Sequence, residues 1–389
     1  GKIVYALGKR KLWKIPLHAP AASVKAIDLP PHNLLRVSAD GSRLVSVSPD
    51  GLRFWRIWDD RVSLEYDAGR TPAVVENLQI GPDGSTAIFI AEGPHTPRDV
   101  WCARIGIRAG NLSRLNPSLT GKPMGQVRPF QYLGPGGKVR KGVMILPAGY
   151  TVGKSYPTVV LVYPTARYTA HPAKFALGDD ARVANPHLLA AHGIAVVAAG
   201  MADGRSRRIP ELVALVNAAA DAAIRNGWSD PNRLGLYGQS DGGFVVNAVI
   251  TRTTRYRAAV SVAGYADYIS RWCSLDDQGN AYGIFSSMTS WGNLLQGTPM
   301  SKPRNFIDHS PLFQMDKVRT PLLLLHGRMD PAVPYEQSDE IFVALRAMRQ
   351  QVEYALYEGE GHHPADWTMP HQLDAAKRIL NWYLKFLTH

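Results

Sequence analysis

Three residues in the second half of the chain have the types and the order needed for nucleophilic acyl chemistry. Ser240, Asp330 and His362 follow one another as nucleophile, acid and base. A serine hydroxyl attacks a carbonyl carbon efficiently only when a neighbouring imidazole takes its proton. The acid then holds the imidazole tautomer and stabilises the charged ring. This order is one of the known triad orders, and it indicates a hydrolase acting through a covalent acyl intermediate.

The surroundings of Ser240 predict a tight turn between a strand and a helix. The apolar run Leu234–Tyr237 is typical of a buried strand, and a helical pattern of apolar residues begins at Phe244. Between them stands Gly-x-Ser-x-Gly, whose glycines let strand and helix approach closely while the serine backbone is strained. The five-residue motif alone is a weak signal. In this context the Asp241 N–H, at the positive end of the helix, is expected to donate to an oxyanion.

The acid and the base are each expected just past the end of an apolar strand. Asp330 follows the run Pro321–His326, and His362 stands in a glycine-rich loop after Val352–Tyr357. Each residue taken alone also fits an ordinary solvated loop residue. His363 is the rival base; His362 is preferred because it directly follows Gly361, where the loop can turn the side chain inward.

Residues 126–389 alternate strand and helix patterns, which predicts an α/β domain with a doubly wound sheet. The later strands are continuous apolar runs, as in a parallel sheet buried on both faces. Ligands of such sheets lie beyond the carboxyl ends of the strands, where the three candidate residues fall. The strand candidates are Val127–Tyr132, Lys138–Leu146, Thr158–Tyr163, Ile194–Ala199, Leu234–Tyr237, Ala258–Val262, Pro321–His326 and Val352–Tyr357, and the helix candidates are Ile209–Asn226, Glu336–Met348 and Leu373–Leu387.

Residues 1–125 are expected to form a separate domain with a linker at its end, and residues 1–112 of it contain a weak internal repeat. Trp13, Trp55 and Trp101 recur at a spacing of about 40–50 residues, which is typical of propeller blades. The turn signals Asp40-Gly41 and Asp83-Gly84 each precede an alternating strand. A sandwich of hairpins is the alternative. Three tryptophan strands give at most three blades, the first without its opening strands. We therefore expect the chain to be the C-terminal part of a longer protein, its true N-terminus absent and its earlier blades missing or held as a separate fragment.

Composition argues against several other classes of protein. The chain has 389 residues, a net charge of +12 and two cysteines. Its basic residues are scattered, so nucleic-acid binding is not expected, and no apolar run has the length of a membrane span. No Cys/His spacing indicates a metal site. The first residues resemble no signal peptide, so they do not reveal the compartment; a cytoplasmic location is favoured over a secreted one.

These motifs together resemble the prolyl oligopeptidase family of serine peptidases over residues 125–389. The resemblance rests on the elbow segment 230–243, the following strand 256–264, the turn 307–311, and the acid and histidine loops 326–334 and 359–362. It implies that Tyr163, at a strand end, adds its hydroxyl to the oxyanion hole beside the Asp241 N–H. By position in the family, it also implies an apolar substrate pocket drawing on Tyr265, Tyr268, Trp272 and Val333.

The sequence departs from the family at two points near this site. Tyr163 is followed by Pro-Thr-Ala instead of the usual glycines, and Ala332 stands where the proline-cleaving prototype has an arginine. Specificity therefore cannot be carried over. We expect a serine peptidase that hydrolyses amide bonds of small or flexible peptides through an acyl-enzyme on Ser240, without a cofactor. Oligopeptidase, acylaminoacyl-peptidase and isopeptidase activities stay open. The alternatives are a carboxylesterase-type acyl hydrolase and a catalytically dead, propeller-bearing binding protein.

Overall fold

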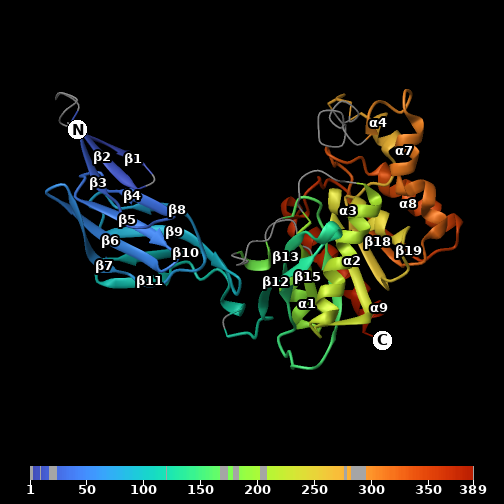
Figure 1. Ribbon diagram of the computed structural model, residues 1–389, viewed down its shortest axis with the longest axis horizontal. Helices are drawn as coiled ribbons and strands as arrows, with labels where there is room; N and C mark the ends of the chain where they lie inside the picture. Colours follow the sequence, from blue (N-terminus) through green and yellow to red (C-terminus); the bar gives the residue numbers. More distant parts are fainter. Residues whose placement is uncertain are drawn as a thin grey trace. The chain divides into compact units, whose positions relative to one another are not determined.

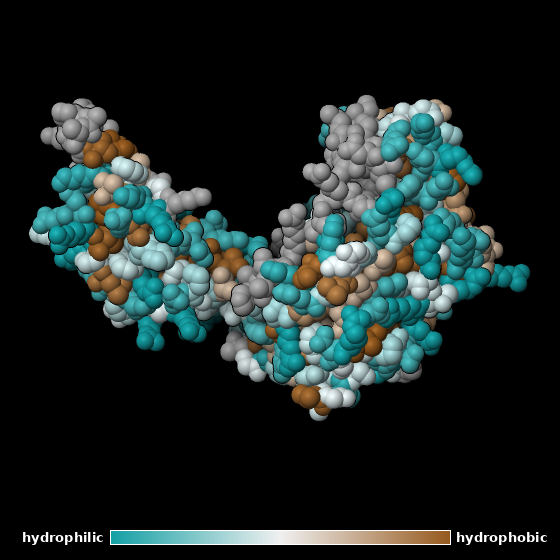
Figure 2. All heavy atoms as spheres, in the orientation of Figure 1, coloured by the Kyte–Doolittle hydropathy of each residue, from teal (hydrophilic) through white to brown (hydrophobic). Residues whose placement is uncertain are grey.

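The computed structural model separates into two compact units (Figure 1). One comprises Gly1–Lys122 with Ala173–Phe175, and the other Pro123–Pro172 with Ala176–His389. The structure describes residues 3–8, 10–16, 24–119, 121–166, 174–177, 184–201, 208–275, 278–281 and 295–388. Within these residues no helix combines the length and the apolar character needed to cross a membrane. Figure 2 shows hydrophilic residues over much of the visible face of each unit, with apolar residues in small groups.

The N-terminal unit consists of antiparallel sheets in which each strand pairs with the next along the chain. The two complete sheets have four strands each, as propeller blades do. Trp55 and Trp101 lie in the third strands of these two sheets. The strands are β1 (Ile3–Leu7), β2 (Lys11–Pro16) and β3 (Lys25–Asp28); β4 (Leu34–Val37), β5 (Arg43–Ser48), β6 (Gly51–Trp58) and β7 (Arg61–Asp67); β8 (Val74–Ile80), β9 (Thr86–Gly93), β10 (Thr96–Arg104) and β11 (Ile107–Asn111).

The first sheet has three strands among the described residues. Trp13 lies in β2, the middle strand of this sheet. Aligned on the tryptophan, β1, β2 and β3 correspond to the second, third and fourth strands of the next two sheets. Among the described residues this sheet therefore contains counterparts of the last three strands of its neighbours, where the sequence suggested that more than one opening strand was lacking.

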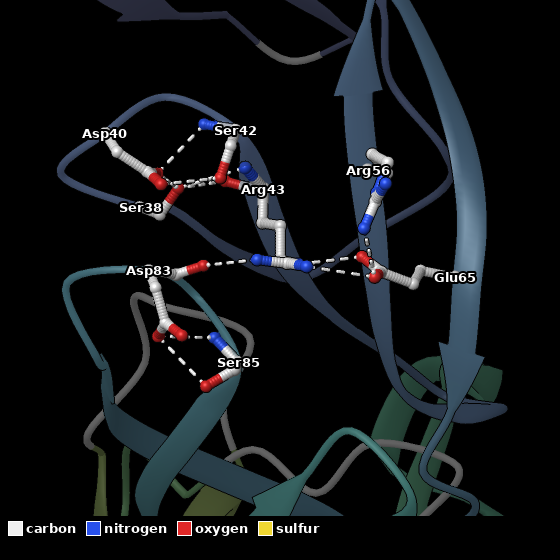
Figure 3. A network of polar contacts seen from close by, with 8 residues as sticks. All are labelled: Ser38, Asp40, Ser42, Arg43, Arg56, Glu65, Asp83 and Ser85. Carbon is white, nitrogen blue, oxygen red and sulfur yellow. Dashed lines mark hydrogen bonds and ion pairs between the residues drawn. The ribbon is translucent and has the colours of Figure 1, made fainter.

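The two predicted turns, at Asp40-Gly41 and Asp83-Gly84, have the same geometry, and Figure 3 shows their polar contacts. Asp40 and Asp83 each accept the main-chain N–H two residues later at 3.0 Å, and the glycines that follow them have φ of +70° and +67°. Arg43 extends from β5, pairs with Glu65 of β7 at 2.8 Å, and donates to the Asp83 carbonyl at 3.0 Å. This side chain therefore links the second sheet to the turn that opens β9.

The C-terminal unit is built on one eight-stranded sheet in the order β12-β13-β15-β14-β16-β17-β18-β19. The first three strands in that order pair antiparallel, and the remaining neighbours pair parallel. All eight strands expected from the sequence are present. Their bounds are β12 (Val127–Leu133), β13 (Val139–Ile145), β14 (Tyr156–Leu161), β15 (Ala195–Ala199), β16 (Ser229–Gln239), β17 (Ala258–Val262), β18 (Leu322–Gly327) and β19 (Val352–Tyr357).

Helices cover both faces of this sheet, as the continuous apolar strands require. One core packs residues of α2 (Ile209–Arg225), α3 (Asp241–Ile250) and α8 (Glu336–Ala347) against the sheet. The opposite core contains residues of α1 (Pro186–Ala191) and α9 (Met369–Leu387). Short helices α4 (Tyr268–Trp272) and α7 (Pro303–His309) lie after β17. The arrangement is a doubly wound α/β sheet, which confirms the predicted fold class.

Candidate active site

Ser240 occupies a strained turn between β16 and α3. Its φ of 55° and ψ of −122° are conformations that a residue with a side chain rarely adopts. The neighbouring glycines are required by space: a Cβ on Gly238 would lie 2.1 Å from the Gly242 carbonyl oxygen. A Cβ on Gly242 would lie 2.3 Å from the Val162 carbonyl oxygen. Close packing of strand, turn and helix therefore fixes where the serine hydroxyl stands.

The structure brings the three predicted residues together. The Nε2 atom of His362 lies 2.9 Å from Ser240 Oγ, and its Nδ1 atom lies 2.7 Å from Asp330 Oδ2. Both distances are within hydrogen-bond range, and they form one continuous path from the hydroxyl to the carboxylate. His363 is exposed, and its ring lies beside that of His362. The geometry therefore places His362, and not His363, against the nucleophile.

The Asp330 side chain is fully buried, and both of its oxygens accept hydrogen bonds. Oδ1 accepts the N–H groups of Ala332 and Val333, each at 2.8 Å. Oδ2 accepts from His362 and, at 3.1 Å, from His326. Burial by itself raises the pKa of the Asp330 carboxyl, but the hydrogen bonds from His326 and His362 lower it well below its usual range. Asp330 is thus held ionised where it can orient the His362 imidazole.

His326 is a part of the site to which sequence reasoning assigned no role. It is completely buried at the end of β18. Its Nε2 faces two acceptors, Asp330 Oδ2 and the Val333 carbonyl at 3.0 Å, so this nitrogen carries the proton. Its Nδ1 lies 2.7 Å from the Ser338 hydroxyl. The sequence feature that could have revealed this role is a histidine that directly follows four leucines in a buried strand, since a buried polar group needs hydrogen-bond partners.

The loop that carries His362 is fixed by contacts at both ends. Gln239, the residue before the nucleophile, donates from Nε2 to the His362 carbonyl at 3.1 Å. Trp367 donates from Nε1 to the Gly361 carbonyl at 2.8 Å. The buried Glu360 accepts from the N–H and hydroxyl of Thr368 and from His371. These contacts restrict the loop to a position in which the imidazole reaches Ser240.

Asp241 and Tyr163, the two predicted oxyanion donors, both lie close to the Ser240 turn. Asp241 is the first residue of α3, at the positive end of the helix dipole. Tyr163 follows the end of β14 and is half-buried. Its ring comes within 3.3 Å of the point that a Cβ on Gly242 would occupy, two residues after the nucleophile. Strand end and helix start thus bring the Tyr163 side chain to the elbow.

The four residues predicted to line a substrate pocket are largely buried in this structure. Tyr265 and Tyr268 are 0% and 2% exposed and pack against Phe244. Val333 is 1% exposed, and Trp272 is partly buried with its ring edge-on to Phe306. The Tyr265 hydroxyl donates to Asp241 Oδ1 at 2.9 Å, so this tyrosine supports the residue after the nucleophile. Direct substrate contact by these four residues stays a prediction.

Comparison with known proteins agrees with this arrangement. Residues 214–389 match the prolyl oligopeptidase family. The uncharacterised peptidase YuxL of Bacillus subtilis is 24% identical over 318 residues, which cover 79% of this chain and 47% of that protein. A puromycin-hydrolysing peptidase of Mycobacterium tuberculosis superposes with a TM-score of 0.68 at 23% identity, over 97% of this chain and 58% of that chain.

The acylaminoacyl peptidase of Pyrococcus horikoshii superposes with a TM-score of 0.66 at 18% identity, over 97% of this chain and 59% of that chain. The chain thus spans about half the length of the curated relative and under two thirds of these two structures. The elbow, the strand order and the family match lead to one conclusion: residues 214–389 match the prolyl oligopeptidase family and lie in a unit with an α/β-hydrolase fold, preceded in the sequence by sheets of the β-propeller type.

Proposed function

We propose that this protein is a serine peptidase that hydrolyses amide bonds of peptides through an acyl-enzyme on Ser240. One observation supports this above all: the hydrogen-bonded path from Ser240 through His362 to Asp330, with links of 2.9 and 2.7 Å. A serine on a strained turn, an imidazole in contact with it and a buried ionised acid behind the imidazole meet the requirements of nucleophilic catalysis.

In the first half of the reaction, Ser240 Oγ attacks the substrate carbonyl carbon while His362 Nε2 takes the hydroxyl proton. The Asp330 carboxylate keeps the other ring proton on Nδ1 and stabilises the charged imidazolium. The negative oxygen of the tetrahedral intermediate accepts from the Asp241 N–H and the Tyr163 hydroxyl. His362 then passes its proton to the leaving amine, and the acyl group stays on Ser240.

In the second half, water replaces the amine. His362 takes a proton from water, the resulting hydroxide equivalent attacks the acyl carbon, and the proton returns to Ser240 Oγ as the ester bond breaks. The same two oxyanion donors serve both halves because both pass through a tetrahedral oxyanion at the same place.

The substrate class within this proposal is small or flexible peptides. The similar proteins carry names that indicate different substrates, among them acylaminoacyl peptidase and puromycin-hydrolysing peptidase. We also propose a partner for the N-terminal unit. The β1-β2-β3 sheet has three described strands where its neighbours have four, so a strand from a separate propeller fragment fits beside β1.

Matched peptide and ester substrates test the proposed function. The wild type and Ser240→Ala are each assayed with acyl-blocked, free, proline-containing and isopeptide-linked peptides, and with simple aryl esters. Turnover of at least one amide that is lost in Ser240→Ala supports a peptidase. Turnover of esters alone supports a carboxylesterase, and a folded wild type that a fluorophosphonate does not label supports a binding protein.

A further inference from the structure

Arg271 is a buried cation beside the site, and the catalytic scheme above gives it no role. It is the fourth residue of α4 and is 6% exposed. Its guanidinium lies over the Tyr265 ring, with Cζ 4.1 Å from the ring centroid. Its Nη2 donates to the Ala332 carbonyl at 3.4 Å, the long end of hydrogen-bond range.

No carboxylate pairs with this guanidinium in the part of the chain that the structure describes. Its Nε is buried and has no hydrogen-bond acceptor there. The acid four residues earlier, Asp267, caps α4: its oxygens accept the N–H groups of Ile269 and Ser270 at 2.9 and 3.1 Å. Because a buried charge is costly unless it is paired, Arg271 has an unused capacity to bind an anion.

The position of Arg271 connects it to two parts of the catalytic machinery. The Tyr265 ring beneath it carries the hydroxyl that donates to Asp241, the residue after the nucleophile. Ala332, whose carbonyl it contacts, gives its N–H to Asp330 Oδ1. The guanidinium therefore lies between the elbow side and the acid side of the site.

We infer that Arg271 binds a carboxylate of the substrate, and that the preferred substrates carry glutamate or aspartate at the residue whose carbonyl Ser240 attacks. This inference rests on the proposed function and names its substrate class. A planar guanidinium with open donors matches the two oxygens of a carboxylate and forms charge-assisted hydrogen bonds with it. The stacked Tyr265 ring holds the fork in one orientation, which reduces the cost of ordering it on binding.

A pair of isosteric substrates tests the inference directly. Acetylated tripeptide p-nitroanilides that differ only in glutamate or glutamine at the residue before the anilide are compared by kcat/KM. We expect the wild type to prefer the glutamate peptide by about tenfold or more, as for one charge-assisted pair. This comparison needs no variant, so it holds even if changes at Arg271 impair folding.

Variants then assign the preference to the residue. Arg271→Met should lower kcat/KM for the glutamate peptide by about the same factor and leave the glutamine peptide within about twofold. Arg271→Lys should keep part of the preference, since it keeps the charge but loses the planar fork. Arg304→Met is the matched control, because Arg304 is an exposed arginine of the neighbouring helix α7, and it should change neither peptide.

Two outcomes overturn the inference. Equal wild-type kcat/KM values on the two peptides would show that no cation binds the glutamate side chain of the substrate. Equal losses on both peptides in Arg271→Met would show that Arg271 supports Tyr265 or contacts the main chain. Fluorophosphonate labelling of the same samples separates these outcomes from failure of the proposed function. An enzyme that is labelled and cleaves the anilides without preference contradicts only the role of Arg271.

Discussion

Asp330→Asn tests how the site controls the His362 tautomer. The carboxylate accepts from four donors: two main-chain N–H groups at Oδ1, and the imidazoles of His362 and His326 at Oδ2. Asparagine has the same shape but only one acceptor oxygen. That oxygen retains the Ala332 and Val333 N–H groups, so the amide NH₂ turns toward the two imidazoles. The ring nitrogens that face it, His362 Nδ1 and His326 Nε2, both carry a proton, so a donor would face a donor in each contact.

The consequence for His362 follows from this mismatch. Its Nδ1 can contact the new NH₂ only as an acceptor, so the ring proton moves to Nε2. An imidazole protonated on Nε2 cannot take the Ser240 proton. The same change in another serine hydrolase lowers kcat on the order of 10⁴-fold by the same tautomer error. We expect a decrease of about 10³–10⁴ here, or roughly 4–5 kcal/mol of transition-state stabilisation.

The assay measures kcat on a peptide p-nitroanilide and the rate of Ser240 labelling by a fluorophosphonate. Asp366→Asn serves as the matched control, because Asp366 is an exposed acid close to the histidine loop, and it should retain wild-type rates. Thermal unfolding establishes that each variant is folded. A folded Asp330→Asn enzyme within tenfold of wild type would refute the reasoning, since His362 would then keep its productive tautomer without the carboxylate.

Three further changes have distinct expected results. Tyr163→Phe removes one oxyanion donor and should lower kcat by about 10²–10³ with little change in KM; an unchanged kcat in steady-state assays excludes that role. His326→Phe keeps a ring but removes its donor to Asp330, and urea unfolding should show a loss of about 2–3 kcal/mol; wild-type stability would contradict the contact. Burial raises the pKa of Glu340 to about 7, so its protonated form stabilises the folded state below its ordinary pKa, and this is lost as pH rises through about 7. Glu340→Gln should therefore raise the melting temperature at pH 8 but not at pH 4, and an equal shift at both values would contradict the assignment.

The strands were predictable because their signal is local. β14 to β18 contain continuous apolar runs in the sequence, since both faces of a central parallel strand are buried. The order of these strands in the sheet was harder to predict. β15 inserts between β13 and β14, and two-sided apolar strands carry little in their own sequence to say which neighbour they pair with. In the N-terminal unit, the repeated tryptophans predicted the blades but not the number of strands in the first sheet.

Some residues of the site could likewise be predicted from the sequence, and others could not. Ser240, Asp330 and His362 were found because each lies at a strand end in a recognisable order. His326 was not, since its role depends on a carboxylate and a hydroxyl that only the folded chain places beside it. Tyr265 and Tyr268 were assigned to a pocket from position in the family; the structure shows them buried against Phe244, and their contact with substrate stays a prediction. Arg271 had no sequence signal, because the absence of a counterion is a property of three-dimensional packing.

The central claim is a covalent acyl intermediate on Ser240, and trapping it is the most direct measurement. A slowly deacylating aryl ester of an acyl-blocked peptide is mixed with the enzyme, quenched in acid and analysed by mass spectrometry of proteolytic fragments. We predict the acyl mass on the fragment that contains Ser240, its absence in Ser240→Ala, and strongly reduced formation in His362→Ala. Turnover of the ester with no acyl mass on that fragment, or an unchanged adduct in Ser240→Ala, would contradict the account.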